Sequence, residues 1–536
     1  MQSTSFEPKR LPLIGQQINR MNSITTDSRV SNGFIEKFEN GEVWLYKRPG
    51  TASYLAPGST GQGLGCYNWN GVIYSIRGTT LYSGTTSLGT VDGTSAYSFV
   101  SVLGGTPRLF FHNNAAAYYY SSTDGLVQLQ TNNLITEACN ITSGSTTVVV
   151  PANTITTEEI GATVTGTGIP AATTVASIVD TTHITISNAA TATTTGVSLT
   201  FAWPSGYPIS TAVPGCAYLD GTVYVLDSGG YIHGSDINQV NIWNPLNIIL
   251  CQLDSDTGVA LHRQLTYIIA FKQWTTEVFY DAGQSPGSPL GSVRGAKLNV
   301  GCASASSIQD IDGTLIWVTG SRSGAPTVMT MSNLQSQVIS TPPVERLLQD
   351  ANMSSVYSWN IKVAGHVFYG LTLKGSNVTL VYDFTIKEWY IWTDNNGNYF
   401  PYVSSTSLGN TQGILQHETQ PLLASMDLTN YTDAGSVNFP VDLYTPNFDG
   451  GVKFNKMLKR MDVIGDQYAS SNPVNITYSE DDYQTWSTTR TVDLSQKRPF
   501  LTDCGTFRRR AYHINHNTAL PLRLKALEMY IATGSK

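Results

Sequence analysis

The chain has 536 residues, of which 41% are apolar and 13% are charged. The charged share is about half that of a typical globular protein, and the length allows several domains that each bury a core, which excludes a small module and a disordered chain. The net charge of −7 excludes a protein that grips DNA over its whole surface. Because no stretch approaches the roughly 18 apolar residues of a membrane span, we expect no membrane insertion.

The charges are unevenly distributed along the chain. Between Leu109 and His262 there is no Lys or Arg but there are ten Asp and Glu, whereas Lys453 to Lys525 contains twelve Lys and Arg and seven Asp and Glu. Basic side chains cannot hold phosphates in the first segment. The two segments are therefore expected to face different electrostatic surroundings.

The first 50 residues are polar and irregular, and they end in KRPG at Lys47 to Gly50. Their composition predicts an N-terminal arm, residues 1–50, that lies across another part of the assembly.

From residue 51 onward, short runs rich in Val, Ile, Thr, Tyr and Phe alternate with Gly, Asn, Asp and Ser turns, which predicts an all-β fold. Helical candidates are short, and the clearest is VERLLQDA after Pro343. Pairs of such runs recur roughly every 40 to 50 residues once one interruption is removed, which is the spacing of β-propeller blades. The pairs begin at Gly71, Pro107, Tyr218, Leu265, Gly313, His366 and Gly413. We predict a discontinuous propeller of about seven blades, formed by residues 51–135 and 204–435.

The interruption, residues 136–203, is rich in Thr, Val, Ala and Ser and contains short alternating runs such as ATVTG and HITIS. This pattern predicts an inserted immunoglobulin-like β-sandwich. A surface loop tolerates such an insertion because the entropy cost of loop closure grows slowly with length.

Residues 436–536 lack the propeller repeat and hold the basic excess, so we expect a separate C-terminal β domain. Its densest basic cluster contains Arg508, Arg509 and Arg510, which are candidates for docking on nucleic acid or an acidic partner. The alternative is that they protect an exposed strand edge against aggregation.

The segment YSEDDYQTW, Tyr478 to Trp486, places Ser479, Asp481, Thr485 and Trp486 at the positions of an Asp-box. This turn recurs in the blades of sialidases, where it has no catalytic role. Here it occurs once, outside the repeats, with Tyr483 where glycine is usual. We therefore predict that these four residues brace a hairpin, as in other Asx-type turns.

No residue pattern predicts catalysis, a metal ion or a cofactor. The acidic pairs Glu158–Glu159 and Asp481–Asp482 lie in polar, turn-like segments, where solvated carboxylates are expected. In HINH, His513 and His516 would point to opposite faces of a strand, which argues against shared metal ligation. The six cysteines are scattered singly and are expected to be reduced and mostly buried.

Several of these features occur together in one family. The N-terminal KRPG, the segments GCASASSIQDIDGTLIWV, HVFYGLTL and TLVYDFTIKEWYIW, and the C-terminal SEDDYQTW and FRRR resemble the packaged-DNA stabilisation proteins of short-tailed bacteriophages, also called tail hub or nozzle proteins. The resemblance covers nearly the whole chain except the insert. The chain departs from the family at Tyr483 and at DCGTFRRR, where a Leu-Gly pair more often precedes the arginine.

The resemblance implies a non-enzymatic virion protein in the phage tail, assembled in the host cytoplasm. It further implies a homohexameric ring below the portal and its adaptor protein, with tail fibres or spikes attached to the tail. The lumen of such a ring would pass double-stranded DNA without sequence preference, and a tail needle or plug would close it until ejection.

The alternative is a phage-borne glycan-binding or glycan-cleaving propeller, acting as a receptor-binding protein or depolymerase. It is favoured by the 28 Tyr and 10 Trp, because aromatic faces stack on sugars. The same residues also pack strands and interfaces.

Overall fold

The computed structural model describes residues 6–11, 13, 27–58, 61–129, 134–152, 154–155, 160–202, 207, 211–409 and 412–533. Strands dominate these residues, and their one α-helix is α1 (Pro342–Gln349). Pro342 and Pro343 occupy its first turn, where a missing N–H costs no hydrogen bond. No helix in the described part of the chain is long and apolar enough to cross a membrane.

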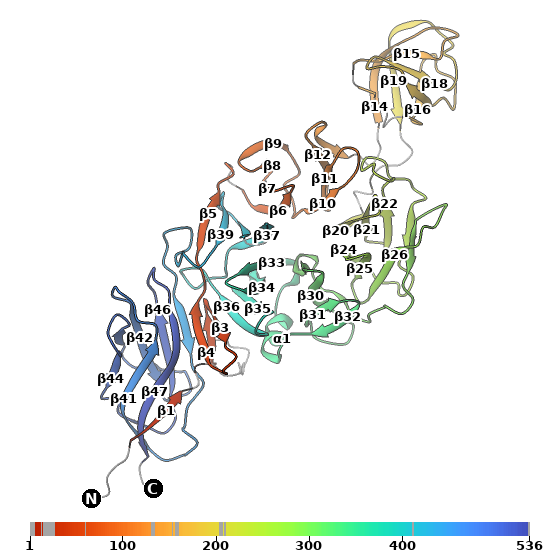
Figure 1. The fold of residues 1–536 in the computed structure, drawn as a ribbon. Coiled ribbons are helices and arrows are strands. Elements are labelled where there is room, and N and C mark those ends of the chain that lie inside the picture. The colour runs from red at the N-terminus through yellow and green to blue at the C-terminus, as the bar shows by residue number, and fades with distance from the viewer. Residues whose placement is uncertain are drawn as a thin grey trace, which may run out of the picture.

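Small antiparallel sheets follow one another along the chain and are arranged in a ring (Figure 1). Tight turns connect their strands, and Asn70 and Gly71, between the first two strands of one sheet, both have positive φ, as a two-residue hairpin turn requires. The sheets before residue 255 are β6 (Gly63–Trp69), β7 (Val72–Arg77), β8 (Thr80–Ser83) and β9 (Thr86–Thr90); β10 (Ser98–Val102), β11 (Arg108–His112), β12 (Ala117–Ser121) and β13 (Gly125–Leu129); and β20 (Ala212–Leu219), β21 (Thr222–Asp227), β22 (Tyr231–Gly234) and β23 (Ile248–Leu250).

Four further sheets complete the ring. They are β24 (Gly258–Gln264), β25 (Tyr267–Lys272), β26 (Thr276–Asp281) and β27 (Leu290–Ser292); β28 (Gly301–Cys302), β29 (Gln309–Ile311), β30 (Thr314–Gly320), β31 (Val328–Ser332) and β32 (Gln335–Val338); β33 (Val356–Val363), β34 (His366–Leu373), β35 (Val378–Asp383) and β36 (Glu388–Trp392); and β37 (Tyr402–Leu408), β38 (Gln412–His417), β39 (Leu423–Met426) and β5 (Thr51–Leu55). Each strand pair picked out in the sequence forms middle strands of one of these sheets. The last sheet combines β5 with strands more than 300 residues later, so the chain closes the ring on itself.

The apolar core of the ring is divided among the interfaces between successive sheets. One cluster, which includes Ile76, Leu81 and Phe111, lies between the first two sheets, and another, which includes Phe271 and Trp317, lies between the sheets of β24–β27 and β28–β32. Each sheet therefore buries both faces against its neighbours. This explains why the middle strands are almost continuously apolar.

The insert forms a sheet of its own, in the order β16-β19-β14-β15-β18-β17. Its core contains Val148, Ile184, Leu199 and Phe201, all fully buried, and Figure 1 shows it apart from the ring. Its strands are β14 (Leu134–Ile141), β15 (Thr147–Val149), β16 (Thr163–Gly166), β17 (Val175–Ile178), β18 (His183–Ile186) and β19 (Thr194–Ala202).

The C-terminal strands form two sheets beside the ring. One extends the sheet of β33–β36 in the order β36-β2-β40-β46-β42-β43, and the other has the order β3-β4-β47-β41-β44, with β1 on β47 and β45 on β41. The strands are β1 (Glu7–Leu11), β2 (Arg29–Ser31), β3 (Gly33–Lys37), β4 (Val43–Lys47), β40 (Val441–Tyr444), β41 (Lys456–Gly465), β42 (Pro473–Ser479), β43 (Arg490–Asp493), β44 (Phe500–Thr502), β45 (Thr506–Phe507), β46 (Ala511–His516) and β47 (Arg523–Thr533).

The segment expected to be an irregular N-terminal arm thus contains four strands, which pair mainly with C-terminal ones. β1 and β4 both pair with β47, and β2 lies between β36 and β40. The partners of these strands lie hundreds of residues away in the chain. A local sequence pattern cannot reveal such pairing, because each strand is short and only half apolar.

Candidate functional site

The ring and the C-terminal sheets meet at a joint that is built around Asn32, at the end of β2. Asn32 has a φ of 55° and its N–H donates to the carbonyl of Ile391 at 2.8 Å. Its amide nitrogen donates to Thr393 Oγ1 and to the carbonyl of Pro440 at 2.8 and 2.9 Å. One buried side chain therefore ties the last strand of a ring sheet to the N-terminal and C-terminal segments.

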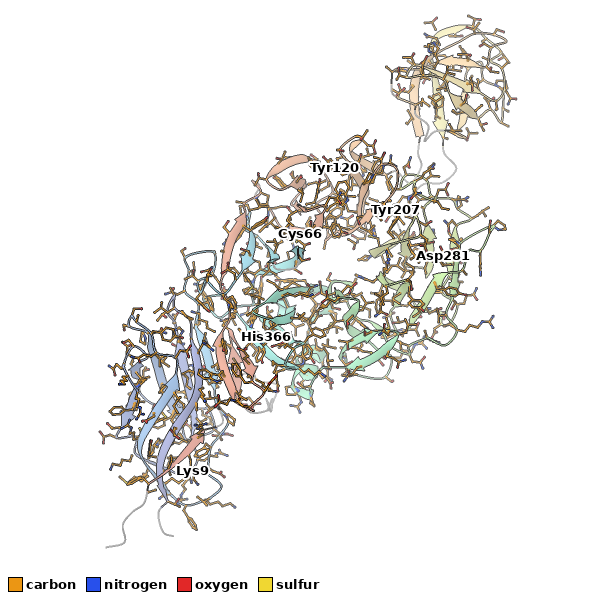
Figure 2. All side chains as sticks on the ribbon, viewed as in Figure 1. Lys9, Cys66, Tyr120, Tyr207, Asp281 and His366 are labelled. Carbon is orange, nitrogen blue, oxygen red and sulfur yellow. The ribbon has the colours of Figure 1, made fainter. Side chains whose placement is uncertain are left out.

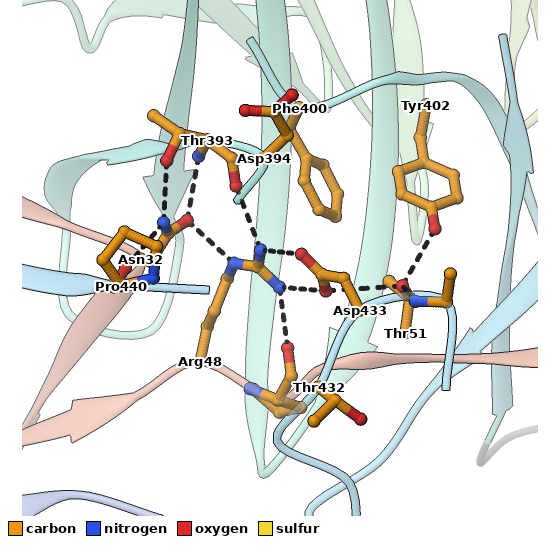
Figure 3. A network of polar contacts seen from close by, with 12 residues as sticks. Asn32, Arg48, Thr51, Thr393, Asp394, Phe400, Tyr402, Thr432, Asp433 and Pro440 are labelled. Carbon is orange, nitrogen blue, oxygen red and sulfur yellow. Dashed lines mark hydrogen bonds and ion pairs between the residues drawn. The ribbon is translucent and has the colours of Figure 1, made fainter. Parts of the chain in front are cut away.

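Arg48, from the KRPG segment, fills the centre of this joint and is fully buried (Figure 3). Its two terminal nitrogens donate to the two carboxylate oxygens of Asp433 at 2.9 and 2.6 Å, and Nε donates to Asn32 Oδ1 at 2.9 Å. The carbonyls of Pro49 and Thr393 accept the remaining N–H groups, both at 3.1 Å. All five donors of the guanidinium are thus used, which a buried arginine requires.

Aromatic rings and a glycine complete the packing around Arg48. The guanidinium carbon lies 3.8 Å from the centroid of Phe439 and 4.7 Å from that of Phe400. Gly50 has no space for a side chain, because a Cβ there would lie 2.0 Å from the carbonyl oxygen of Thr432. Burial and the neighbouring Arg48 lower the pKa of Lys47 to about 7. The joint is therefore a dense polar core, unlike a flexible linker.

The ring encloses a cavity of about 620 Å³ along its axis. Most of its lining comes from the first strand or the preceding loop of the ring sheets, and in the sheet of β28–β32 it comes from the segment between β28 and β30. Figure 2 shows Cys66 of β6 on this inner side. Most polar groups that line it are neutral, including Ser98, Ser306, Ser358 and Ser404. Such a lining offers hydrogen bonds but little charge.

The ionisable groups of this cavity are engaged within the chain. The two carboxylate oxygens of Glu418 bond to Lys374 Nζ at 2.5 Å and to the hydroxyl of Tyr399 at 2.8 Å. Asp310 accepts the N–H of Gly313 at 2.8 Å, and burial raises the pKa of its carboxyl. Burial lowers the pKa of His262 to about 4, so its imidazole is neutral at pH 7. The carboxylate of Glu418 thus belongs to an ion pair and that of Asp310 to a turn. Neither arrangement supports a pair of catalytic carboxyl groups as in a glycosidase.

The predicted brace residues meet in the hairpin between β42 and β43. Asp481 Oδ1 accepts the hydroxyl of Ser479 at 2.8 Å and the N–H of Thr485 at 2.9 Å. The hydroxyl of Thr485 bonds to the other carboxylate oxygen. Trp486 packs edge-on against Tyr444 and His513 of the neighbouring strands. The bonds from Thr485, before those from Ser479, lower the pKa of Asp481 to about 2.

The three arginines of the basic cluster have different surroundings. Arg510 is buried, donates to Glu480 and to the carbonyl of Cys504, and lies 3.9 Å from the centroid of Tyr478. Arg508 and Arg509 are exposed and contact Asn455 and Asp482, respectively. Docking on a partner therefore stays a prediction for Arg508 and Arg509, whereas Arg510 holds the fold together.

The histidines of HINH, the cysteines and the pair Glu158–Glu159 are the other candidates from the sequence. His513 bonds to Asp442 at 2.7 Å and His516, fully buried, bonds to Asn472 at 2.7 Å, so the two histidines have separate partners. All six cysteines are free, and burial raises the pKa of the Cys66 thiol to about 12. The pair Glu158–Glu159 lies outside the described residues.

The sequence did not reveal the Arg48 joint. KRPG ends the predicted N-terminal segment, but two partners of Arg48, Thr393 and Asp433, are more than 300 residues from it in the chain. The signal available was a Lys-Arg pair beside proline and glycine, between the apolar runs VWLY and SYL. That signal suggests burial without naming the partner.

A family model described as "Bacteriophage P22 Gp10, beta-propeller" matches residues 32–402. No curated protein matches the chain in sequence. Among solved structures, the computationally designed Ika8 protein is 11% identical, with 70% of this chain and 98% of that chain covered and a TM-score of 0.32. U3-55K is 10% identical, with 71% and 100% covered and a TM-score of 0.33.

Proposed function

The chain belongs to the bacteriophage P22 Gp10 β-propeller family, whose members are structural proteins that stabilise packaged DNA, and we propose that it is a tail hub, or nozzle, subunit. In this proposal the ring of sheets is a seven-bladed propeller and the insert is an immunoglobulin-like sandwich. Copies of the chain form a homohexameric ring below the portal and adaptor. The ring extends the DNA channel and helps to retain the genome until ejection.

The size of the axial cavity supports assembly of several copies. A duplex whose grooves alone are about 12 and 6 Å wide does not fit through a cavity of about 620 Å³ that is enclosed by one propeller. DNA would therefore pass between copies of the chain and not along the propeller axis. The small axial cavity is the observation that, together with the family, carries the proposal of a ring of several copies.

The low content of basic residues favours a protein along which DNA slides over one that binds DNA tightly. A surface with few basic residues forms few ion pairs with phosphates, so DNA can slide along it without strong, salt-dependent binding. The basic excess lies in the C-terminal sheets, where exposed Arg508 and Arg509 are candidates for contact with the adaptor or a neighbouring copy.

The rigidity of the joint supports a role for the chain in the wall of a tail that is under pressure. The ring sheet of β33–β36 continues through β2 into the C-terminal sheet, so the two parts share backbone hydrogen bonds. Packaged DNA exerts pressure on a closed tail, and a subunit in that wall needs parts that do not rotate against each other. A tail needle or plug would close the lumen, and tail fibres or spikes would attach outside it.

Assembly tests this proposal directly. Purified full-length chain, alone and mixed with portal and adaptor, would be observed by electron microscopy and analytical ultracentrifugation. We expect closed rings of defined subunit number with a central opening. Replacing Arg508 and Arg509 together by Ser should weaken docking while the fold is retained. A chain that stays monomeric with both partners present contradicts the proposal.

A glycan-binding propeller is the second candidate. Tyr67, Tyr97, Phe99 and Tyr357 line the axial cavity beside many hydroxyl groups, and aromatic faces with polar neighbours can hold sugars. Binding of host polysaccharide by the purified chain, or release of reducing sugar from it, would favour this function over the ring.

A further inference from the structure

A buried ionic cluster lies at the end of the β24–β27 sheet where β25 turns into β26. It consists of Lys272, Asp256 and Glu277. Their side chains are 0%, 1% and 2% exposed. Lys272 ends β25, Glu277 lies in β26, and Asp256 lies in the segment that leads from the preceding sheet into β24. The cluster has one cation and two anions, which is a costly arrangement to bury as a simple ion pair.

The geometry around Lys272 brings an amine to two carboxylates. Its Nζ lies 3.0 Å from Asp256 Oδ1 and 3.0 Å from Glu277 Oε1, and it donates to the carbonyl of Asp254 at 2.6 Å. These contacts hold the amine against both carboxylates, so the entropy of bringing the groups together has already been lost.

The carboxyl group of Asp256 is held like an acyl group in a catalytic site. Its Oδ2 accepts the main-chain N–H groups of Trp274 and Thr275 at 2.7 and 2.9 Å, and the hydroxyl of Thr275 donates to Oδ1 at 3.0 Å. Two N–H groups directed at one oxygen would stabilise the negative charge that develops there when a nucleophile adds to the carbon.

We propose that Lys272 and Asp256 join in an intramolecular amide bond, and that Glu277 carries the proton during its formation. One proton of the Lys272 ammonium moves to Asp256 Oδ1 across their 3.0 Å contact, which leaves a neutral amine and a neutral carboxyl group. The amine attacks Cγ of Asp256, and the N–H groups of Trp274 and Thr275 hold the oxyanion on Oδ2. Glu277 accepts the proton that the nitrogen loses and gives it to the Oδ1 hydroxyl, and the C–Oδ1 bond breaks to release one water.

The reaction balances without any other reagent. One ammonium and one carboxylate give one amide and one water, and Glu277 ends as it began. The product replaces the buried ammonium and one buried carboxylate by a neutral group, and Glu277 keeps the N–H of Leu253 as a partner at 3.2 Å. The bond ties the crossover segment between two ring sheets to the strand that ends at Lys272, so it strengthens the wall of the ring against separation of these sheets.

Intact-mass measurement of the purified full-length chain tests the bond. We expect a mass lower than that of the sequence by one water, and full mass for the variants Lys272→Met and Glu277→Gln. Lys297→Met is the matched control, because Lys297 donates to the carbonyl of Leu253 in the same region and should leave the water loss unchanged.

A protease digest locates the bond. Trypsin should no longer cleave after Lys272, and a branched peptide should contain both Lys272 and Asp256. Full mass in the unaltered chain overturns the proposal, as does a water loss that persists in Lys272→Met, since a cyclic imide elsewhere would then explain it. Water loss that persists in Glu277→Gln overturns the role of Glu277.

Discussion

The joint and the insert are two ways of attaching a second β-structure to the same ring. At the joint, β2 pairs with β36 in parallel and with β40 antiparallel, so one sheet runs from the ring into the C-terminal part. The insert instead has a sheet and a core that contain its own strands alone. The C-terminal part should therefore fold with the ring, whereas the insert should fold by itself.

The joint and the insert also differ in whether their ion pairs are buried. The joint buries Arg48 against Asp433, and such a pair is strongly destabilising when one partner is removed. In the insert, the ion pair of His183 with Asp180 is exposed, where such pairs contribute little. Of these two attachments, the one that buries charge is therefore the one whose parts share a sheet.

The largest effect is expected from Arg48→Ala. The change leaves the Asp433 carboxylate, whose side chain is 16% exposed, without its cation, and loss of one partner of a buried pair costs about 3–5 kcal/mol. Urea unfolding of the full chain measures it, with Arg508→Ala as the exposed control, for which we expect a change within about 0.5 kcal/mol. Equal effects of the two variants would show that the joint does not hold the parts together.

A pair of core variants tests whether the insert unfolds alone. Leu199 in the insert and Leu261 in the ring are both fully buried, and each change to Ala should cost about 2–5 kcal/mol. Hydrogen exchange by mass spectrometry should show Leu199→Ala weakening protection in residues 134–202 alone. Leu261→Ala should weaken the ring and leave the insert protected. Shared loss of protection would contradict the comparison.

Mild acid should lower the stability of the ring more than that of the insert. Burial lowers the pKa of His112 in the ring to about 4, below the unfolded value near 6.5. Its contribution to stability is therefore complete above about pH 6.5 and is lost as the pH falls toward 4, by about 2 kcal/mol at pH 5. His183 of the insert is exposed. Thermal unfolding from pH 7 to 5 should show a weaker ring and an unchanged insert. His112→Gln should reduce the change, while His262 and His417, whose pKa values burial also lowers to about 4, still contribute.

A smaller, local effect is expected from Asp481→Ala in the C-terminal hairpin. The change removes the acceptor for Ser479 and Thr485, so hydrogen exchange of residues 480–486 should become faster while the unfolding midpoint changes little. Because the pKa of Asp481 is lowered to about 2, its contribution is present above the unfolded value near 4 and is lost as the pH falls toward 2. Unchanged exchange in this turn would show that it needs no brace.

The smallest effect is expected from deletion of residues 134–202 with a short linker. Loop closure costs little more for a long segment than for a short one, so the ring should keep its unfolding midpoint. Insoluble or unfolded protein would show that the insert shares stability with the ring.

The sequence predicted the features that depend on nearby residues. The strand pairs follow from the sequence because each sheet is made of consecutive strands. The insert as a separate domain and the turn at Asp481 as a brace stay predictions, drawn from a change of composition and from residues a few positions apart. The family is confirmed by the match over residues 32–402. The pairing of β5 with β39 and the Arg48 joint could not be predicted, since their partners are separated by more than 300 residues.

The central claim is that copies of this chain surround the DNA exit of the virion. Electron cryomicroscopy of intact virions measures it most directly. We expect density for the propeller and C-terminal sheets in a homohexameric ring directly below the portal and adaptor, with the duplex between copies and the insert on the outside. Virions in which the chain is absent, lies in peripheral appendages, or leaves no DNA-sized opening between its copies would contradict the account.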